Sequence, residues 1–149
     1  MRREKDFEDL FASFNKHKVR YCIVGAYALG FHAEPRYTKD MDLLIERTTA
    51  NAERILRALK DFGFSFTNLK VGDLTRKGNI IQLGYEPVRV DLLTSLRGVP
   101  FERAWKQKIK GRYGAQRVFF LGVGDLIKNK KAVGRRQDLA DLELLGKKR

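Results

Sequence analysis

The sequence predicts an α+β domain in which helices flank a small mixed β-sheet. Short apolar runs alternate with segments whose apolar residues recur at helical spacing, which indicates interleaved strands and helices. Glycine or proline punctuates the ends of several of these segments. With 149 residues and 43% hydrophobic content, the chain is long enough for one ordinary domain. We therefore expect residues 1–149 to form a single domain.

The first half of the chain is predicted to contain three helices and two strands. Residues 5–17 place four apolar side chains on one helical stripe, which we interpret as a core face. Residues 20–24 form a short apolar run that ends at Gly25 and is typical of a buried strand. The remaining elements are a short helix over 26–33 that ends before Pro35, a strand over 40–46, and an amphipathic helix over 48–63 with Thr48 or Thr49 as its cap and Gly63 as its stop.

The second half is predicted to contain two strands followed by two helices. Residues 79–84 and 88–93 are the strands, joined by a turn-like segment. Residues 124–134 and 137–146 are the helices, which separate near Gly134. We expect these C-terminal helices, within 125–146, to pack on the sheet.

Composition limits the class of protein. The formal net charge is +13, and residues 101–149 hold fourteen basic and five acidic side chains. This excess predicts a polyanionic partner such as nucleic acid or nucleotide phosphate, although a merely solvated basic surface is the alternative. The single cysteine, Cys22, excludes an internal disulfide, and no apolar run is long enough for a signal peptide or membrane span. We expect a soluble cytoplasmic protein with no membrane partner.

Two carboxylates, Asp40 and Asp42, interrupt an apolar run that is predicted to be a strand. Residues two apart in a strand share a face, so both acids point the same way while their neighbours point into the core. An acidic, solvent-exposed strand face is one interpretation. The other is a bound divalent cation, Mg²⁺ or Mn²⁺, that neutralises the pair.

A third acid and a glycine turn favour the cation. Asp91 interrupts the apolar segment "VRVDLL", and an adjacent strand could bring it beside the first pair. Gly25 lies between a predicted strand and a predicted helix, where backbone N–H groups at a helix N-terminus can bind a phosphate. Each signal is weak alone, and together they form a specific pattern.

The segment "VGAYALGFHAEPRYTKDMDLLIE" resembles the signature of the nucleotidyltransferase superfamily related to DNA polymerase beta. The closer resemblance is to small bacterial and archaeal nucleotidyltransferases of the abortive-infection toxin (AbiEii) type, which carry an R-x-T-x-D-x-D segment after the glycine turn. Their C-terminal pattern of a lysine, an arginine and two acids is similar to "GDLIKNKKAVGRRQDLADLELL". The resemblance covers residues 18–146. The matching residues are Arg36, Thr38, Asp40 and Asp42 in the first segment, and Lys130, Arg135, Asp138 and Asp141 in the second.

The resemblance implies the nucleotidyltransferase fold and transfer of a nucleoside monophosphate from a nucleoside triphosphate to an acceptor hydroxyl. The net charge favours RNA as the acceptor, for example a tRNA end as in the related toxins, ahead of protein or small-molecule hydroxyls. Many members have Ser or Gly where this chain has Ala26, so a phosphate-binding hydroxyl is missing. A catalytically degenerate binding module is therefore the alternative, and a plain basic RNA-binding domain is a third. The implied catalytic and metal residues are Asp40, Asp42 and Asp91, and the implied nucleotide-binding residues are Gly25, Ala26, Arg36, Thr38 and Lys130.

Other residues are open to two interpretations. Leu126, Lys130 and Val133 share one helical stripe, so Lys130 faces inward and needs an anion unless its amine reaches water. Asp138 and Asp141 fit a helix cap and a first-turn acid better than catalytic groups. For the remaining aromatic and histidine residues, we expect either base stacking or core packing at Phe101, Trp105 and Tyr113, packing at His32, and exposure at His17.

Overall fold

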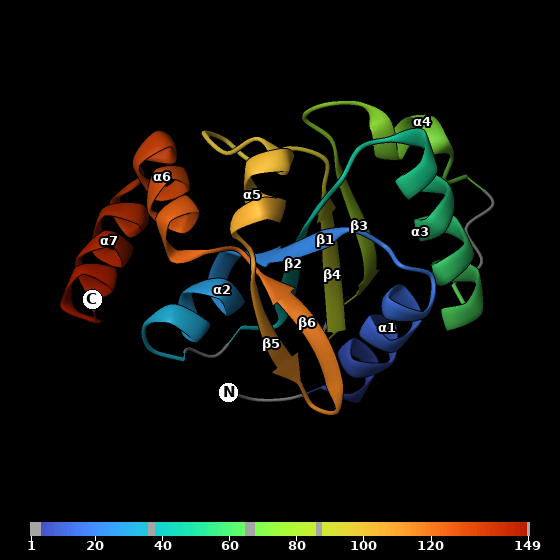
Figure 1. The fold of residues 1–149 in the computed structure, drawn as a ribbon, viewed down its shortest axis with the longest axis horizontal. Coiled ribbons are helices and arrows are strands. Elements are labelled where there is room, and N and C mark those ends of the chain that lie inside the picture. Colours follow the sequence, from blue (N-terminus) through green and yellow to red (C-terminus); the bar gives the residue numbers. More distant parts are fainter. Residues whose placement is uncertain (1–3, 36–37, 65–67, 86–87, 149) are drawn as a thin grey trace.

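A computed structural model describes residues 4–35, 38–64, 68–85 and 88–148. Within these ranges the chain forms one six-stranded mixed sheet and seven helices (Figure 1). The strands are β1 (Tyr21–Val24), β2 (Asp40–Ile45), β3 (Ile80–Tyr85), β4 (Val88–Leu93), β5 (Ile109–Tyr113) and β6 (Gln116–Phe120). The helices are α1 (Lys5–Lys16), α2 (Gly25–His32), α3 (Thr49–Phe62), α4 (Val71–Thr75), α5 (Phe101–Gln107), α6 (Val123–Val133) and α7 (Arg136–Lys148).

The strand order across the sheet is β3-β4-β2-β1-β6-β5. β2 runs antiparallel to β1 and parallel to β4, and β1 runs parallel to β6. This mixture of directions confirms the predicted α+β class with a mixed sheet. Every element predicted above is present, within a few residues of the expected ends.

Opposite faces of the sheet are covered by different helices. Phe11 and Phe14 of α1 pack their rings against Tyr21 of β1, whereas the next residue, Cys22, contacts the Ala104 carbonyl of α5. Successive side chains of a strand point to opposite faces, so α1 and α5 lie on opposite sides of the sheet. Figure 1 shows α1 with α3 and α4 on one side of the strands, and α6 with α7 at the far end of the molecule.

The same alternation determines which face holds the acids of β2. Cys22 pairs with Leu44, and Val24 pairs with Asp42, across the β1–β2 ladder. Directly opposed residues in a ladder share a face, so Asp42 and Leu44 lie on the α5 face. Leu43 and Ile45 are fully buried on the α1 face.

Local chemistry explains where the helices begin and end. The Thr48 hydroxyl accepts from the Asn51 N–H, which confirms Thr48 as the cap of α3. Gly63 and Gly134 end α3 and α6 in the left-handed conformation, at φ 105° and 69°. None of the helices in the described ranges combines the length and apolarity needed to cross a bilayer.

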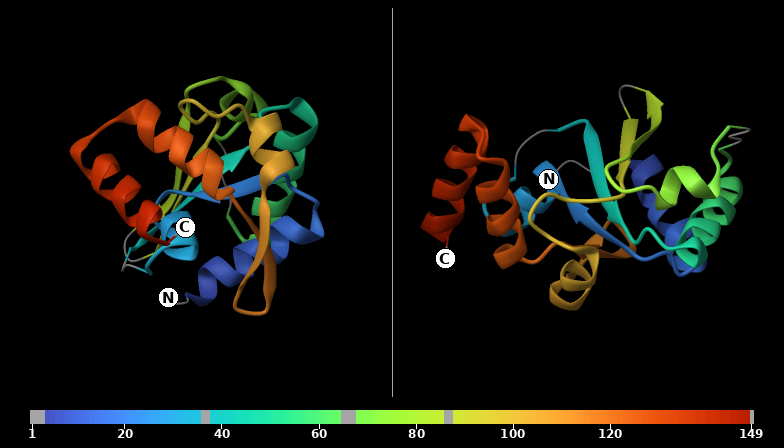
Figure 2. Two further views of the ribbon diagram at one scale, coloured as in Figure 1. Left: turned by 60° about the vertical axis from the view of Figure 1, so that its left-hand side comes forward. Right: turned by 90° about the horizontal axis from the view of Figure 1, so that it is seen from above.

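The α6–α7 pair is attached to the rest of the molecule through a loop and a helix. Asn129 of α6 donates from Nδ2 to the Arg97 carbonyl at 3.0 Å, in the loop that precedes α5. Gly98 in the same loop lies against Ala132 of α6, where a side chain on residue 98 would collide. Figure 2 shows α6 and α7 side by side, with α2 beside them. These contacts hold α6 next to the end of the sheet that carries Gly25.

Candidate active site

Three carboxylates share one face of two neighbouring strands. In the parallel β2–β4 ladder, Asp42 is opposite Asp91, and Asp40 is opposite Arg89. Asp91 is 8% exposed, and Asp40 and Asp42 are half-buried. The ladder therefore brings the three predicted acids together on the α5 face.

Arg89 contacts the third acid. Its Nε donates to Asp91 Oδ1 at 3.0 Å, and its Nη2 donates to Asp91 Oδ2 at 2.9 Å. Both oxygens of this carboxylate are therefore engaged. Among the residues that the structure describes, no group of three acidic, histidine or cysteine side chains is arranged to hold a metal ion. Arg89 and Asp91 are two residues apart in β4 and therefore share a strand face, but this spacing alone does not predict that they pair.

The electrostatics of the two remaining carboxylates favour a cation. Burial, together with the neighbouring charges of Asp91 and Asp40, raises the pKa of Asp42 to about 6. Asp40 Oδ1 is buried and has no hydrogen-bond partner among the described residues. A divalent cation would satisfy this oxygen and remove the repulsion, and oxygen donors are the ligands that Mg²⁺ prefers. The donor set therefore fits a hard divalent cation.

The turn between β1 and α2 lies against Asp42. Gly25 adopts φ +67°, a left-handed conformation that side chains disfavour. A Cβ atom on residue 25 would overlap Asp42 Oδ2. Val24 is the N-cap residue of α2, and its side chain makes no capping hydrogen bond to the N–H groups of the first turn. The first backbone N–H groups of α2 therefore lie beside the carboxylates. They include those of Gly25 and Ala26.

The segment before β2 is only partly described. The Thr38 hydroxyl lies 3.3 Å from the Asp40 N–H and 3.4 Å from the Asp40 carbonyl, so Thr38 is attached to the start of β2. Arg36, a predicted phosphate-binding residue, lies outside the described residues. Its expected role stays a prediction.

Lys130 faces inward, as its place on the apolar stripe predicted, and it is 8% exposed. Its Nζ lies 2.9 Å from Asp141 Oδ2 and 3.4 Å from Asp138 Oδ1, both on α7. Its positive charge also acts to lower the pKa of Asp42. Lys130 thus joins α6 to α7 and contributes positive potential at the carboxylates.

The two acids of α7 have structural roles. Asp138 accepts from the backbone N–H of Arg135 at 3.0 Å and from its guanidinium, which confirms the prediction of an acid at the helix start. These contacts lower the pKa of Asp138 to about 2. Asp141 was expected in the first turn, but α7 begins at Arg136, so Asp141 lies one turn later and contacts Lys130 instead.

Some of the predictions for aromatic and histidine residues agree with the structure, and one does not. Tyr113 packs among Phe7, Phe11 and Tyr27 in the core. Trp105 is half-buried, stacks on Phe101, and carries Lys108 Nζ 3.8 Å above its ring centre. His32 hydrogen bonds to the Leu121 carbonyl, as expected for a packed residue. The predicted exposure of His17 was wrong, because its ring contacts Asp61 and its side chain is 18% exposed.

No family model and no curated protein sequence matches this chain. Solved structures do match it. A candidate nucleotidyltransferase from Thermotoga maritima, TM1012, matches with a TM-score of 0.60 at 16% identity, over 96% of this chain and 91% of that one. The lincosamide antibiotic adenylyltransferase LnuA, in a lincomycin-bound structure, matches with a TM-score of 0.58 at 13% identity, over 96% of both chains. These likenesses show that the chain has the nucleotidyltransferase fold.

Proposed function

We propose that the protein is a metal-dependent nucleotidyltransferase, which transfers a nucleoside monophosphate from a nucleoside triphosphate such as ATP to an acceptor hydroxyl. The observation that carries this proposal is the register of Asp42 opposite Asp91, with Asp40 two residues away and Gly25 against Asp42. A purely structural strand pair has no need of three like charges on one buried face. The nucleotidyltransferase fold of the chain supports the same function.

Asp40, Asp42 and Asp91 would hold Mg²⁺ or Mn²⁺. When bound, such ions neutralise phosphate charge and stabilise both the attacking and the leaving oxygen of an in-line displacement. Asp40 brings an oxygen that has no partner in the described structure, and Asp42 brings a carboxylate whose repulsion by its neighbours a cation would relieve. Asp91 would become available once Arg89 releases it.

The remaining groups bind and orient phosphate. The Gly25 and Ala26 N–H groups at the start of α2 would donate to phosphate oxygens, and the missing side chain of Gly25 lets the Asp42 carboxylate lie against this turn. Arg36, Thr38 and Lys130 would add positive charge or hydrogen bonds, and Arg89 would turn to the phosphates when it leaves Asp91. Asp91 would accept the proton of the acceptor hydroxyl.

RNA, for example a tRNA end, is the acceptor that the net charge favours. Lys106 and Lys110 are exposed on neighbouring elements, α5 and β5, of the basic C-terminal third. Membership of the abortive-infection toxin type would agree with an RNA acceptor. Against it, LnuA is an antibiotic adenylyltransferase with a small molecule bound, so a small acceptor is the second candidate.

Transfer of label from each of the four [α-³²P]nucleoside triphosphates to total tRNA, with Mg²⁺ or Mn²⁺, tests the function. A variant with Asp42→Asn should lose all transfer, whereas the exposed control Asp6→Asn should retain it. Nucleotide binding by calorimetry is measured in parallel. Nucleotide binding without transfer to any acceptor would support the catalytically degenerate binding module, for which Ala26 is the argument. Absence of nucleotide binding would contradict both the enzyme and the degenerate module.

Salt dependence tests RNA binding separately. Each phosphate contact releases counterions, so log K should fall by roughly 0.7 to 0.9 per contact for each tenfold rise in salt. Charge reversal at Lys106, Lys108 and Lys110 should flatten this slope and leave nucleotide binding unchanged. If the protein binds no tRNA at low salt, the basic side chains form a solvated surface and do not bind RNA.

A further inference from the structure

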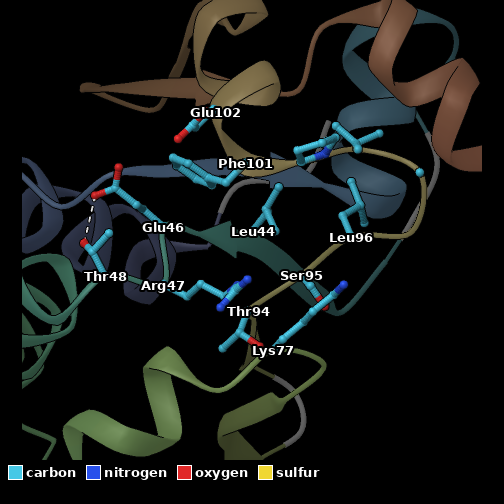
Figure 3. A pocket seen from close by; sticks show the side chains of 13 residues that line it. Leu44, Glu46, Arg47, Thr48, Lys77, Thr94, Ser95, Leu96, Phe101 and Glu102 are labelled. Atoms are coloured by element: carbon cyan, nitrogen blue, oxygen red, sulfur yellow. Dashed lines mark hydrogen bonds between the residues drawn. The ribbon is translucent and has the colours of Figure 1, made fainter.

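A cavity of about 710 Å³ opens on the carboxylate face of the sheet (Figure 3). Leu44 of β2 contributes to its lining and lies two residues beyond Asp42 on the same strand face, a spacing of about 6.6 Å. Phe101 and Glu102 of α5 line it from above the sheet. The cavity is therefore next to the candidate active site but separate from its residues.

The cavity and the Gly25 turn lie at opposite ends of the carboxylates. β1 and β2 are antiparallel, with Val24 opposite Asp42, so Gly25 lies toward the start of β2. Leu44 and Glu46, which line the cavity, lie toward the end of β2. A line along β2 thus passes from the Gly25 turn, across Asp42, to the cavity.

The order of these features along β2 matters for an in-line displacement. The acceptor oxygen bonds to the α-phosphorus while the bond to the pyrophosphate oxygen breaks on the opposite side. If the β- and γ-phosphates bind at Gly25, as the proposed function requires, the acceptor hydroxyl must approach from the opposite side. Its proton passes to Asp91, and pyrophosphate leaves toward α2. The cavity lies on the side from which the acceptor comes.

The lining of the cavity indicates the kind of acceptor. Figure 3 shows Phe101 on the same side as the carboxylates of Glu46 and Glu102, with Arg47 and Lys77 across the cavity. An aromatic ring beside carboxylates is a favourable site for a protonated amine. Glu46 already accepts from Thr48 at 3.0 Å and lies 3.4 Å from Arg20, whereas Glu102 and Lys77 have no hydrogen bond or ion pair within the described structure, so these two can contact a ligand. Lys77 and Arg47 can donate to hydroxyl oxygens.

The volume favours a small molecule over a polynucleotide. Small-molecule sites commonly have volumes of about 300 to 1,000 Å³, which includes this cavity. The lining carries two acidic side chains, Glu46 and Glu102, and two basic ones, Arg47 and Lys77, so it lacks the excess of basic groups that an RNA backbone requires. We propose that this cavity binds the second of the two candidate acceptors, a small hydroxylated molecule that carries a protonated amine, of the amino-sugar type. This proposal rests on the proposed nucleotidyl transfer.

A matched pair of ligands tests the proposal by binding alone. The β-1,4-linked glucosamine trimer and cellotriose have the same linkage and differ in having an amine or a hydroxyl at C2. Calorimetry with Mg²⁺ and a non-hydrolysable ATP analogue should show that the wild type binds the glucosamine trimer about tenfold or more tightly than cellotriose. Glu102→Gln should remove that preference. The control Glu53→Gln, an exposed acid on α3, should retain it.

Each outcome is informative. Equal binding or no binding of the two trimers would overturn the proposal, as would a loss of ATP-analogue affinity in Glu102→Gln, which would make the cavity a nucleoside site. Transfer of label to tRNA that is unaffected by the glucosamine trimer would likewise exclude a small-molecule acceptor site here. Failure of the proposed function looks different, because the wild type would then bind no ATP analogue at all, whatever the trimers do.

Discussion

The Arg89 guanidinium donates both of its hydrogen bonds to one carboxylate, that of Asp91, at 3.0 and 2.9 Å. Arg89 is also opposite Asp40 in the β2–β4 ladder. Part of the positive charge that the three acids require is therefore supplied by a side chain of the protein itself. A metal ion that uses Asp91 must compete with this side chain for the same two oxygens.

The first prediction concerns that competition. Replacing Arg89 with Gln should raise Mn²⁺ affinity by about tenfold, because the ion then no longer displaces a charge-assisted hydrogen-bonded pair. The same change should destabilise the metal-free fold by about 1 to 3 kcal/mol, because Asp91 stays buried and loses its partner. Calorimetric titration with Mn²⁺ and urea unfolding measure the two effects. Arg57→Gln, an exposed change on α3, should alter neither, and weaker Mn²⁺ binding in the Arg89 variant would contradict the competition.

The second prediction concerns the pH dependence of stability. The pKa of Asp42 is raised from 3.8 to about 6 in the folded protein, so between these pH values the folded state binds more protons than the unfolded state. Stability in EDTA should therefore fall as pH rises from about 4 to 6, by on the order of 3 kcal/mol from this residue, and then level off. Asp42→Asn has no such titration, so its advantage over the wild type should be near zero at pH 4 and largest above pH 6.

Urea unfolding at pH 4, 5, 6 and 7 measures this difference. Asp6→Asn, an exposed change on α1, should follow the wild-type pH profile. If Asp42→Asn is less stable than the wild type at pH 7, the carboxylate is a structural group and not a destabilised site residue.

The third prediction concerns the glycine that touches Asp42. Gly25→Ala must place a side chain at φ +67° and against Asp42 Oδ2, so it should cost more than the roughly 1 to 2 kcal/mol of the left-handed conformation alone. Gly134→Ala isolates the conformational cost, because φ is +69° there, close to that of Gly25, and the new Cβ would make only an ordinary contact with the Lys131 carbonyl at 3.6 Å. Gly146→Ala, in open space within α7, should be stabilising by about 0.5 to 1 kcal/mol. Urea unfolding compares the three, and equal losses at residues 25 and 134 would show that Asp42 moves aside without cost.

Sequence reasoning recovered the parts of the fold that have strong local signals. The apolar runs at β1, β2 and β4 and the capped helix α3 are examples, because their burial pattern or cap is written in consecutive residues. α4, α5 and the β5–β6 hairpin were not predicted. α4 and α5 have only 5 and 7 residues, too few for a clear helical period, and basic residues interrupt the short apolar alternations of β5 and β6. The available signal for this hairpin was the turn residue Gly114, at φ 61°, together with Tyr113 and Val118 on the buried face.

The candidate site was predictable in its residue types but not in its partners. Same-face spacing placed Asp40 and Asp42 together, and the register with β4 added Asp91. That register depends on long-range pairing, which no local pattern encodes. Tertiary packing decides which oppositely charged group lies near Arg89 and which lies near Lys130. The pairing of Arg89 with Asp91 and of Lys130 with the acids of α7 is therefore seen only in the structure.

The last prediction separates two roles of Lys130. Replacing it with Met should cost about 3 to 5 kcal/mol, because Asp141 and Asp138 are each about 1% exposed and lose a cationic partner. Adding Asp141→Asn should recover part of that loss, because the buried carboxylate that Lys130 contacts at 2.9 Å is then replaced by a neutral amide. If Lys130 also assists the nucleotide, the recovered double variant should still bind an ATP analogue about tenfold more weakly than Asp141→Asn alone. Lys131→Met, an exposed change on the same helix, should affect neither unfolding nor nucleotide binding, and a double variant with full nucleotide affinity would confine Lys130 to joining α6 and α7.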